Sequence, residues 1–154
     1  MPTRLEPIYL ANILLYVADA ESICDFPFIS KACHEAMLTL KTNPVAFSES
    51  PRAILAYFPN INTMVINSLS SLSAPATLPD TVTSLIVKKV AFEHDRHARF
   101  IPWPYADRVV EIQECTDFPV DLSPFTRLEW LTLFDIPYHF TLPTHPLKHI
   151  LVLH

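Results

Sequence analysis

Apolar residues recur in one short pattern over the last two thirds of the chain. Two apolar residues stand three apart, and a third follows two residues later. Successive copies of this pattern begin 21, 27, 19 and 19 residues apart. A strand pattern that repeats about every 20 to 29 residues is typical of leucine-rich repeats. The sequence therefore predicts about five parallel strands in a short, irregular solenoid. The copies are Ile61-x-x-Met64-x-Ile66, Val82-x-x-Leu85-x-Val87, Val109-x-x-Ile112-x-Glu114, Leu128-x-x-Leu131-x-Leu133 and Leu147-x-x-Ile150-x-Val152.

The third copy is interrupted, because Glu114 stands where the pattern requires an inward apolar side chain. A buried carboxylate without a partner would cost several kcal/mol. Two explanations are open at this point. Either the strand contains a bulge that moves Glu114 outward, or this position lies near the open edge of the sheet.

The first third of the chain has helical periodicity instead. Apolar residues three and four apart predict a helix over residues 5–17. This helix is apolar nearly all round, so it is either enclosed or docks on another surface. A second short helix is expected up to Phe26, with Pro27 ending it. Ser30 is a good N-cap for a third helix over residues 31–40.

A fourth helix is expected to begin at Ser50-Pro51. Serine supplies the cap, and proline at the first helical position loses no hydrogen bond there. The helix is predicted to run through Tyr57 and to lead into a strand over residues 62–67. This order, a helix followed by a strand, is that of a repeat unit.

Together these patterns predict an α/β protein with two parts. A small helical head covers residues 1–47, and a leucine-rich-repeat array with a parallel sheet covers residues 48–154. The apolar strand expected over residues 147–154 has no polar cap after it. A solenoid normally ends in such a cap. The array is therefore expected to be truncated, or to form half of an end-to-end dimer.

Composition excludes several classes of function. Glycine is absent, which excludes glycine-rich phosphate loops and dinucleotide-binding turns. The net charge is −5 and no basic stripe occurs, so nucleic acid is not an expected partner. No apolar run is long enough to span a membrane. Without glycine, left-handed backbone positions are expected either to be filled by asparagine or aspartate, or to be avoided. The candidates are Asn43, Asn60, Asn62, Asn67 and Asp80.

Groups suited to catalysis or metal binding are few. The loop His94-Asp95-x-His97 offers three ligands but no recognisable fourth. His145 and His149 stand four apart, but Pro146 between them argues against a helix that would align them. Cys33 and His34 are adjacent on a helix and point apart. We therefore expect no enzyme, no metal and no cofactor.

The compartment is inferred from the cysteines. Cys24, Cys33 and Cys115 are odd in number and share no ligand spacing, as expected of small buried residues in a reducing, cytoplasmic environment. There is one alternative. Arg4 precedes an apolar run, and Ala18-Asp19-Ala20 resembles a signal-peptide cleavage site. On that reading residues 1–20 are removed and the rest is a secreted or surface repeat protein.

The head resembles an F-box. Leu5, Ile13, Leu14 and Val17 match the first helix of that family, Ile23 and Phe26 match the second, and Ile29-Ser30-Lys31 matches its Val-Ser-basic segment. The chain departs from the family in three places. Pro7 comes one position late, Ile8 replaces a glutamate, and Cys33 replaces the usual tryptophan. The order of head and repeats is similar to that of protist leucine-rich-repeat proteins with F-box-like starts.

The resemblance implies a role in ubiquitin ligation. F-box proteins dock their head onto the small adaptor of a cullin–RING ubiquitin ligase and hold a substrate on their repeats. The adaptor-binding residues that the resemblance implies are Leu5, Pro7, Ile13, Leu14, Val17 and Ile29.

Strand alternation separately predicts which side chains pave the open face of the sheet. This face would contact the client protein. Another layer could instead cover it, and the whole chain could be a structural remnant without a partner. The predicted client-binding residues are Val65, Ile86, Trp130, Thr132 and Leu151.

Overall fold

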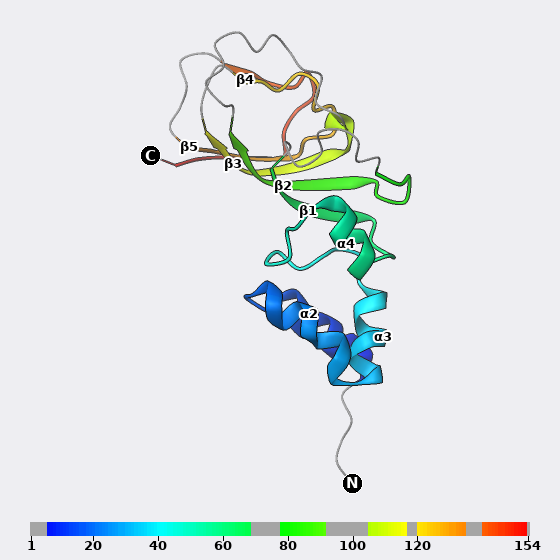
Figure 1. The fold of residues 1–154 in the computed structure, drawn as a ribbon. Coiled ribbons are helices and arrows are strands. Elements are labelled where there is room, and N and C mark those ends of the chain that lie inside the picture. Colours follow the sequence, from blue (N-terminus) through cyan, green and yellow to red (C-terminus); the bar gives the residue numbers. More distant parts are fainter. Residues whose placement is uncertain (1–5, 69–77, 92–104, 117–119, 135–139, 154) are drawn as a thin grey trace. The chain divides into compact units, whose positions relative to one another are not determined.

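A computed structural model describes residues 6–68, 78–91, 105–116, 120–134 and 140–153. These residues form four α-helices and a five-stranded parallel sheet (Figure 1), which confirms the predicted α/β class. The chain divides into two compact units. One comprises residues 1–65 and 78–82, and the other comprises residues 66–77 and 83–154.

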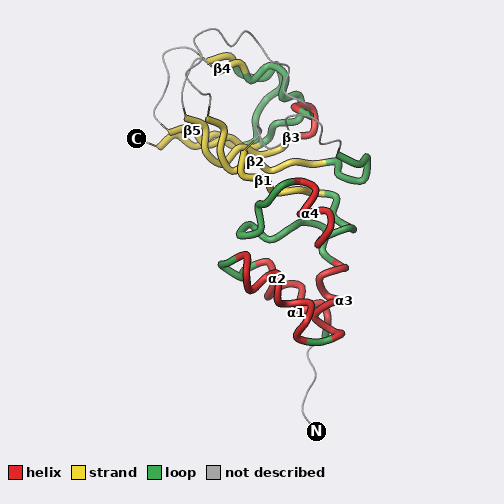
Figure 2. Tube along the Cα trace, in the orientation of Figure 1, coloured by secondary structure: helices red, strands yellow, loops and turns green. Residues whose placement is uncertain are grey.

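The first unit contains three helices near the N-terminus, α1 (Pro7–Leu15), α2 (Ala20–Ile29) and α3 (Lys31–Thr39). Figure 2 shows them as the first three helical segments of the trace. Both α1 and α2 pack against α3. Their shared core consists of the buried side chains Ala11, Leu14, Ile23, Phe26, Ala32, Cys33, Ala36 and Met37.

Side-chain caps define where α2 and α3 begin. Asp19 Oδ1 accepts a hydrogen bond from the Ser22 N–H at 2.7 Å. Ser30 Oγ accepts one from the Cys33 N–H at 3.2 Å, so the predicted cap is confirmed. The expected end of the second helix is wrong, because Pro27 lies inside α2. Proline removes one backbone hydrogen bond, and the helix ends two residues later, where Ser30 is extended.

The fourth helix, α4 (Pro51–Tyr57), begins as predicted. Ser50 Oγ accepts a hydrogen bond from the Ala53 N–H at 3.3 Å, and Pro51 fills the first helical position. Phe47 and Phe58 lie on either side of α4 in the sequence, and their rings meet edge to face with centroids 5.4 Å apart. Phe58 and Ile54 are fully buried, so aromatic packing fixes this helix in the first unit.

A buried asparagine ties the segment before α4 to strand β1 (Thr63–Ser68). Thr42 and Thr63 form an isolated parallel bridge. One residue on, Asn43 Oδ1 accepts from the Val65 N–H at 2.8 Å, and Asn43 Nδ2 donates to the Val65 carbonyl at 2.9 Å. Asn43 Nδ2 also donates to the Phe47 carbonyl at 2.8 Å. The asparagine thus bonds to β1 much as a neighbouring strand would.

The strands of the main sheet lie in the order β1-β2-β3-β5-β7. They are β1, β2 (Ser84–Ala91), β3 (Val109–Thr116), β5 (Trp130–Phe134) and β7 (His149–Leu153). Each of the five predicted strands is therefore present. Most inward positions of the pattern are fully buried, namely Met64, Ile66, Leu85, Val87, Ile112, Leu131 and Leu133. The last strand differs, because Ile150 is 52% exposed.

Two short strands form a second sheet that the sequence did not predict. β4 (Val120–Asp121) and β6 (Phe140–Thr141) pair in parallel. The chain therefore alternates between the two sheets from β3 to β7, and Figure 1 shows β4 apart from β3 and β5. Strands of two residues carry no detectable periodicity. Leu122 and Phe125, which follow β4, are buried and belong to the apolar core.

The strand pairs explain the position of Glu114. Ile112 and Cys115 of β3 lie opposite Leu131 and Leu133 of β5, so β3 has one extra residue there. Cys115 takes the inward position and is fully buried. The carboxylate is displaced outward and pairs with Lys89 Nζ at 3.2 Å. Of the two open explanations, the bulge is confirmed, and it lies in a central strand.

The register of β2 differs from the one that the repeat pattern predicts. Aligning the copies places Leu85 beside Ile112, but the partner of Ile112 is Val87. Further along, Ile112 pairs with Leu131, which pairs with Ile150, as the pattern predicts. The shift of two residues falls in the repeat with the longest spacing. Because side chains alternate with a period of two, the shift keeps apolar residues inward.

In the part of the chain that the structure describes, no asparagine or aspartate takes a left-handed backbone position. Among the described residues a positive φ occurs at Tyr105, with φ 64° and ψ 22°. This residue precedes a short 3-10 helix, η2 (Ala106–Arg108), where Arg108 lies over the Tyr105 ring at 5.1 Å. The five candidate asparagine and aspartate positions avoid that region, as the second alternative expects, whereas the use of Tyr105 was not expected.

Candidate interaction surfaces

The outward side of α1 is an apolar surface. Tyr9 and Ile13 are exposed and stand four residues apart, which places them on one face of the helix. Tyr16, the C-cap residue that follows the helix, is exposed as well. Ile8 is also exposed, whereas Leu14 is fully buried against the other helices. The described residues thus do not enclose the first helix. We call Ile8, Tyr9, Ile13 and Tyr16 the α1 face.

The end of α2 adds two more exposed apolar side chains. Phe28 and Ile29 are 84% and 71% exposed, although Ile23 and Phe26 of the same helix are buried. Large apolar side chains at such exposure are typical of contact surfaces when they cluster. The helical head therefore carries exposed apolar side chains on two of its three helices.

The residues implied by the F-box resemblance are placed unequally. Ile13 and Ile29 are exposed, and Pro7 and Val17 are partly buried. Leu14 is fully buried in the head and has no surface to offer a partner. Leu5 lies outside the described residues. The F-box resemblance did not point to the exposed residues Tyr9, Tyr16 and Phe28. The two tyrosines could have been found in the sequence, because they stand four and three residues from Ile13.

The open face of the main sheet carries one continuous row of side chains. Ile86 pairs with Glu111, Glu111 with Trp130, and Trp130 with His149. Residues that pair in register project from the same face of a sheet. Ile86 is partly buried, and Trp130 is 45% exposed. Val65, expected to be accessible on this face, is buried in β1.

Trp130 and His149 form a stack on this face. Their ring centroids are 3.7 Å apart and the rings are inclined by 17°. Two further pairs follow along β5 and β7. In the first, Leu151 is exposed and its partner Thr132 is partly buried. In the second, Phe134 and Leu153 are both exposed. The open face is therefore apolar and aromatic over its last two strands.

Charged side chains flank this apolar region, and most are paired. Lys148 Nζ lies 2.8 Å from Glu129 Oε2, and Lys89 Nζ pairs with Glu114. Glu111 is different. Its polar partner is Gln113, whose Nε2 donates to Glu111 Oε1 at 3.0 Å, and no lysine or arginine among the described residues pairs with it. One carboxylate beside the aromatic stack is therefore left without a counter-ion there.

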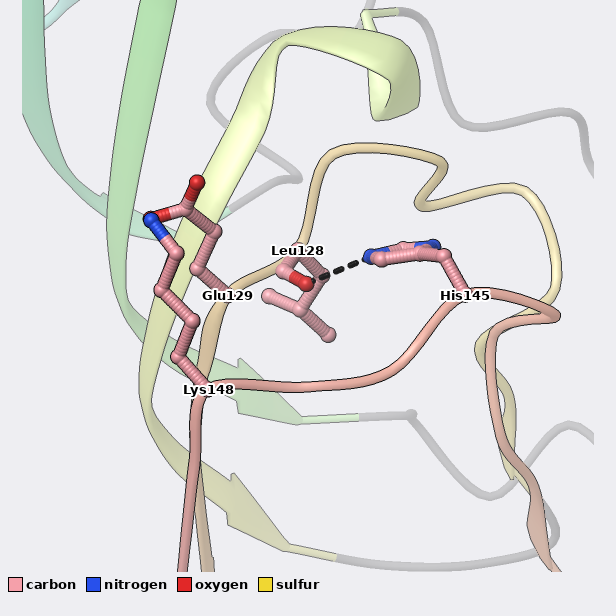
Figure 3. A network of polar contacts seen from close by, with 4 residues as sticks. All are labelled: Leu128, Glu129, His145 and Lys148. Carbon is pink, nitrogen blue, oxygen red and sulfur yellow. Dashed lines mark hydrogen bonds and ion pairs between the residues drawn. The ribbon is translucent and has the colours of Figure 1, made fainter.

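Polar contacts fix the segment before β7 to the segment before β5 (Figure 3). His145 Nε2 lies 2.7 Å from the Leu128 carbonyl oxygen, and the Lys148–Glu129 ion pair lies beside it. The Glu129 carbonyl accepts from the N–H groups of Lys148 and His149. The contacts hold β7 in register, which places the His149 ring against Trp130.

These histidines do not form a metal site. His145 contacts a carbonyl and His149 stacks on a ring. Over the described ranges, no group of three or more His, Cys, Asp or Glu side chains is placed to hold a metal ion. The loop His94-Asp95-x-His97 lies outside those ranges.

Cys24, Cys33 and Cys115 form no disulfide with one another, and two of them, Cys33 and Cys115, are buried as expected. The Ser30 hydroxyl donates to Cys33 Sγ at 3.2 Å, while His34 is exposed, so the adjacent pair does not form a thiolate–imidazole couple. A hydrogen bond with Cys24 raises the pKa of Tyr57. A raised pKa makes the phenol harder to ionise and does not activate it as a nucleophile.

Comparisons with models of protein families, with curated proteins and with solved structures gave no match. Among the described residues, no helix is both long and apolar enough to cross a lipid bilayer. Two surfaces of this chain therefore bear on its function. They are the α1 face with the end of α2, and the open face of the sheet.

Proposed function

We propose that the chain is a non-catalytic protein-interaction module of the F-box type. Its helical head docks the adaptor of a cullin–RING ubiquitin ligase, and its sheet holds a client protein. The observation that carries the proposal is the exposure of apolar side chains on α1 and at the end of α2, in a head whose three helices already share a core.

The chemistry of the head favours a protein partner. Burying a large apolar side chain contributes about 1.5 to 3 kcal/mol, so six exposed ones can support a stable contact. Tyrosine is enriched among the residues that dominate binding energy, and Tyr9 and Tyr16 flank Ile13 on the α1 face. The face has no acidic or basic side chain between Pro7 and Val17, which favours an apolar groove on the partner.

We further propose that residues 48–154 form a short leucine-rich-repeat solenoid. The alternation of the chain between the main sheet and the β4–β6 sheet supports this, because each passage returns to a parallel strand. The register of β3, β5 and β7 adds support, since Ile112, Leu131 and Ile150 are successive partners and stand 19 residues apart in the sequence. Such arrays bind proteins on their strand face.

Co-expression with the ligase adaptor tests the docking. We expect the wild-type chain to co-purify with the adaptor and the Ile13→Asp/Ile29→Asp variant to lose it. Val45→Asp is the matched control, because Val45 is exposed to the same 50% as Ile13 but lies outside α1 and α2. Circular dichroism checks that all three chains are folded. Failure of the wild type to co-purify, or equal capture of the double variant, contradicts the docking.

The secreted alternative is less well supported. Removing residues 1–20 would delete α1, and Leu14 fills the core beside α3. The buried side of α3 would then face water at a cost of several kcal/mol. We therefore propose a cytoplasmic protein that keeps its first helix. N-terminal sequencing of the native protein decides between the two, and a start at Glu21 would overturn the F-box proposal.

A further inference from the structure

The open face of the sheet carries a specific chemical pattern where β3, β5 and β7 meet. Glu111, Trp130 and His149 stand side by side in register, one on each strand. Neighbouring strands lie about 4.8 Å apart, so an acidic side chain lies directly beside an aromatic stack.

The stack leaves one face of the indole turned towards Glu111. The His149 ring lies 3.7 Å from the Trp130 ring and nearly parallel to it. Because His149 belongs to β7, it covers the side of the indole that faces that strand. The opposite side faces β3, where Glu111 stands. A planar cation inserted there would meet a ring face and a carboxylate at once.

The charge of Glu111 is available for such a cation. A carboxylate has two oxygens and about four acceptor sites, and Gln113 occupies one of them. Glu114 and Glu129, by contrast, each have a lysine. Lys88, which follows Val87 on β2, has interactions of its own. Among the described residues, the carboxylate next to the stack therefore lacks the counter-ion that its neighbours have.

We infer that the open face binds an extended peptide segment with a basic side chain, preferably arginine, held between Glu111 and Trp130. The guanidinium is planar, bonds carboxylates through two N–H groups and stacks on aromatic rings. Farther along the same face lie the side chains of Leu151, Phe134 and Leu153. In a strand, side chains on one face recur every two residues, which is about 6.7 Å. The segment therefore has an aliphatic side chain two or three residues from the arginine. The inference rests on the proposed role of the sheet as the client surface.

Peptide selection on the full chain tests the inference. A phage library of random peptides is selected against the immobilised protein, and the enriched sequences are synthesised. We expect enrichment of arginine close to leucine, isoleucine or valine. Replacing that arginine with citrulline, which has the same shape without the charge, should weaken binding about ten-fold.

Variants locate the site. Glu111→Gln keeps an acceptor for Gln113 but removes the charge. It should weaken binding of the arginine peptide as much as replacing the arginine with citrulline does. Binding of the citrulline peptide should then be unchanged by Glu111→Gln. Glu35→Gln is the control, because Glu35 is an exposed carboxylate in the helical head, paired with Lys31. Should Glu111→Gln fail to fold, the citrulline comparison on the wild-type chain still decides.

The outcomes separate this inference from the proposed function. Enriched peptides that lack a basic residue, or are acidic, overturn the inference but leave the sheet as a binding surface. A selection that enriches nothing overturns both the inference and the client role. Adaptor capture is measured separately and should be unaffected by Glu111→Gln. Loss of adaptor capture with intact arginine binding contradicts only the docking proposal.

Discussion

At the scale of single residues, Asn43 replaces hydrogen bonds that a neighbouring strand would supply. Its side chain satisfies the N–H and the carbonyl of Val65 and the carbonyl of Phe47. All of these groups are buried with it. A buried backbone group without a partner costs about 1 to 3 kcal/mol. One asparagine therefore prevents three such losses.

Replacing Asn43 should destabilise the chain strongly. We expect Asn43→Ala to lower the free energy of unfolding by about 3 kcal/mol, as measured by urea unfolding. Asn60→Ala is the control, because Asn60 is exposed and makes one hydrogen bond, to the Leu38 carbonyl. It should cost about 1 kcal/mol or less. Equal losses from the two variants would show that the Asn43 network does not carry this stability.

At the scale of elements, the bulge in β3 decides which side chain enters the core. Cys115 occupies the inward position and is fully buried, whereas the Glu114 side chain is 38% exposed and paired with Lys89. Val87 and Val90 of β2 face Ile112 and Cys115 of β3, so both strands have two residues between their inward positions. Lys89 on β2 and Glu114 on β3 both lie in these two-residue intervals, and their side chains form the ion pair.

Two substitutions test this arrangement. Cys115→Ser places a hydroxyl in an apolar position and should lower the free energy of unfolding by about 2 kcal/mol. Glu114→Gln removes a partly exposed ion pair, which contributes about 1 kcal/mol at most. Urea unfolding of both variants gives the comparison. A larger loss for Glu114→Gln than for Cys115→Ser would place the glutamate inward and refute the bulge.

The sequence predicted elements better than their register. The apolar pattern located each strand of the main sheet to within a few residues, because inward side chains repeat with a fixed period. It left the bulge undecided, because local spacing does not show whether Glu114 or Cys115 faces inward. The same limit applied to Val65, whose burial depends on Asn43 and other residues far away in the sequence. Of the surfaces, Trp130 and Ile13 were predicted, whereas Tyr16 and Phe28 were found from exposure.

At the scale of the whole molecule, the main sheet ends in an apolar strand. β7 is the last strand in the order of the sheet. Ile150 on one face and Leu151 on the other are both about half exposed, at 52% and 54%. An edge strand with exposed apolar side chains and unpaired backbone groups is a template for pairing with another strand. Natural edge strands usually carry a charge that prevents this.

This edge should make the protein associate with itself as its concentration rises. We expect sedimentation velocity to show dimers or larger species of the wild-type chain, and Ile150→Lys to shift it towards the monomer, because a charge on the edge opposes pairing. Val45→Lys, equally exposed but remote in sequence, is the control for added charge. Ile13→Asp tests whether the α1 face is responsible instead. A wild-type chain that stays monomeric, or association that survives Ile150→Lys but not Ile13→Asp, would rule out the β7 edge as the contact.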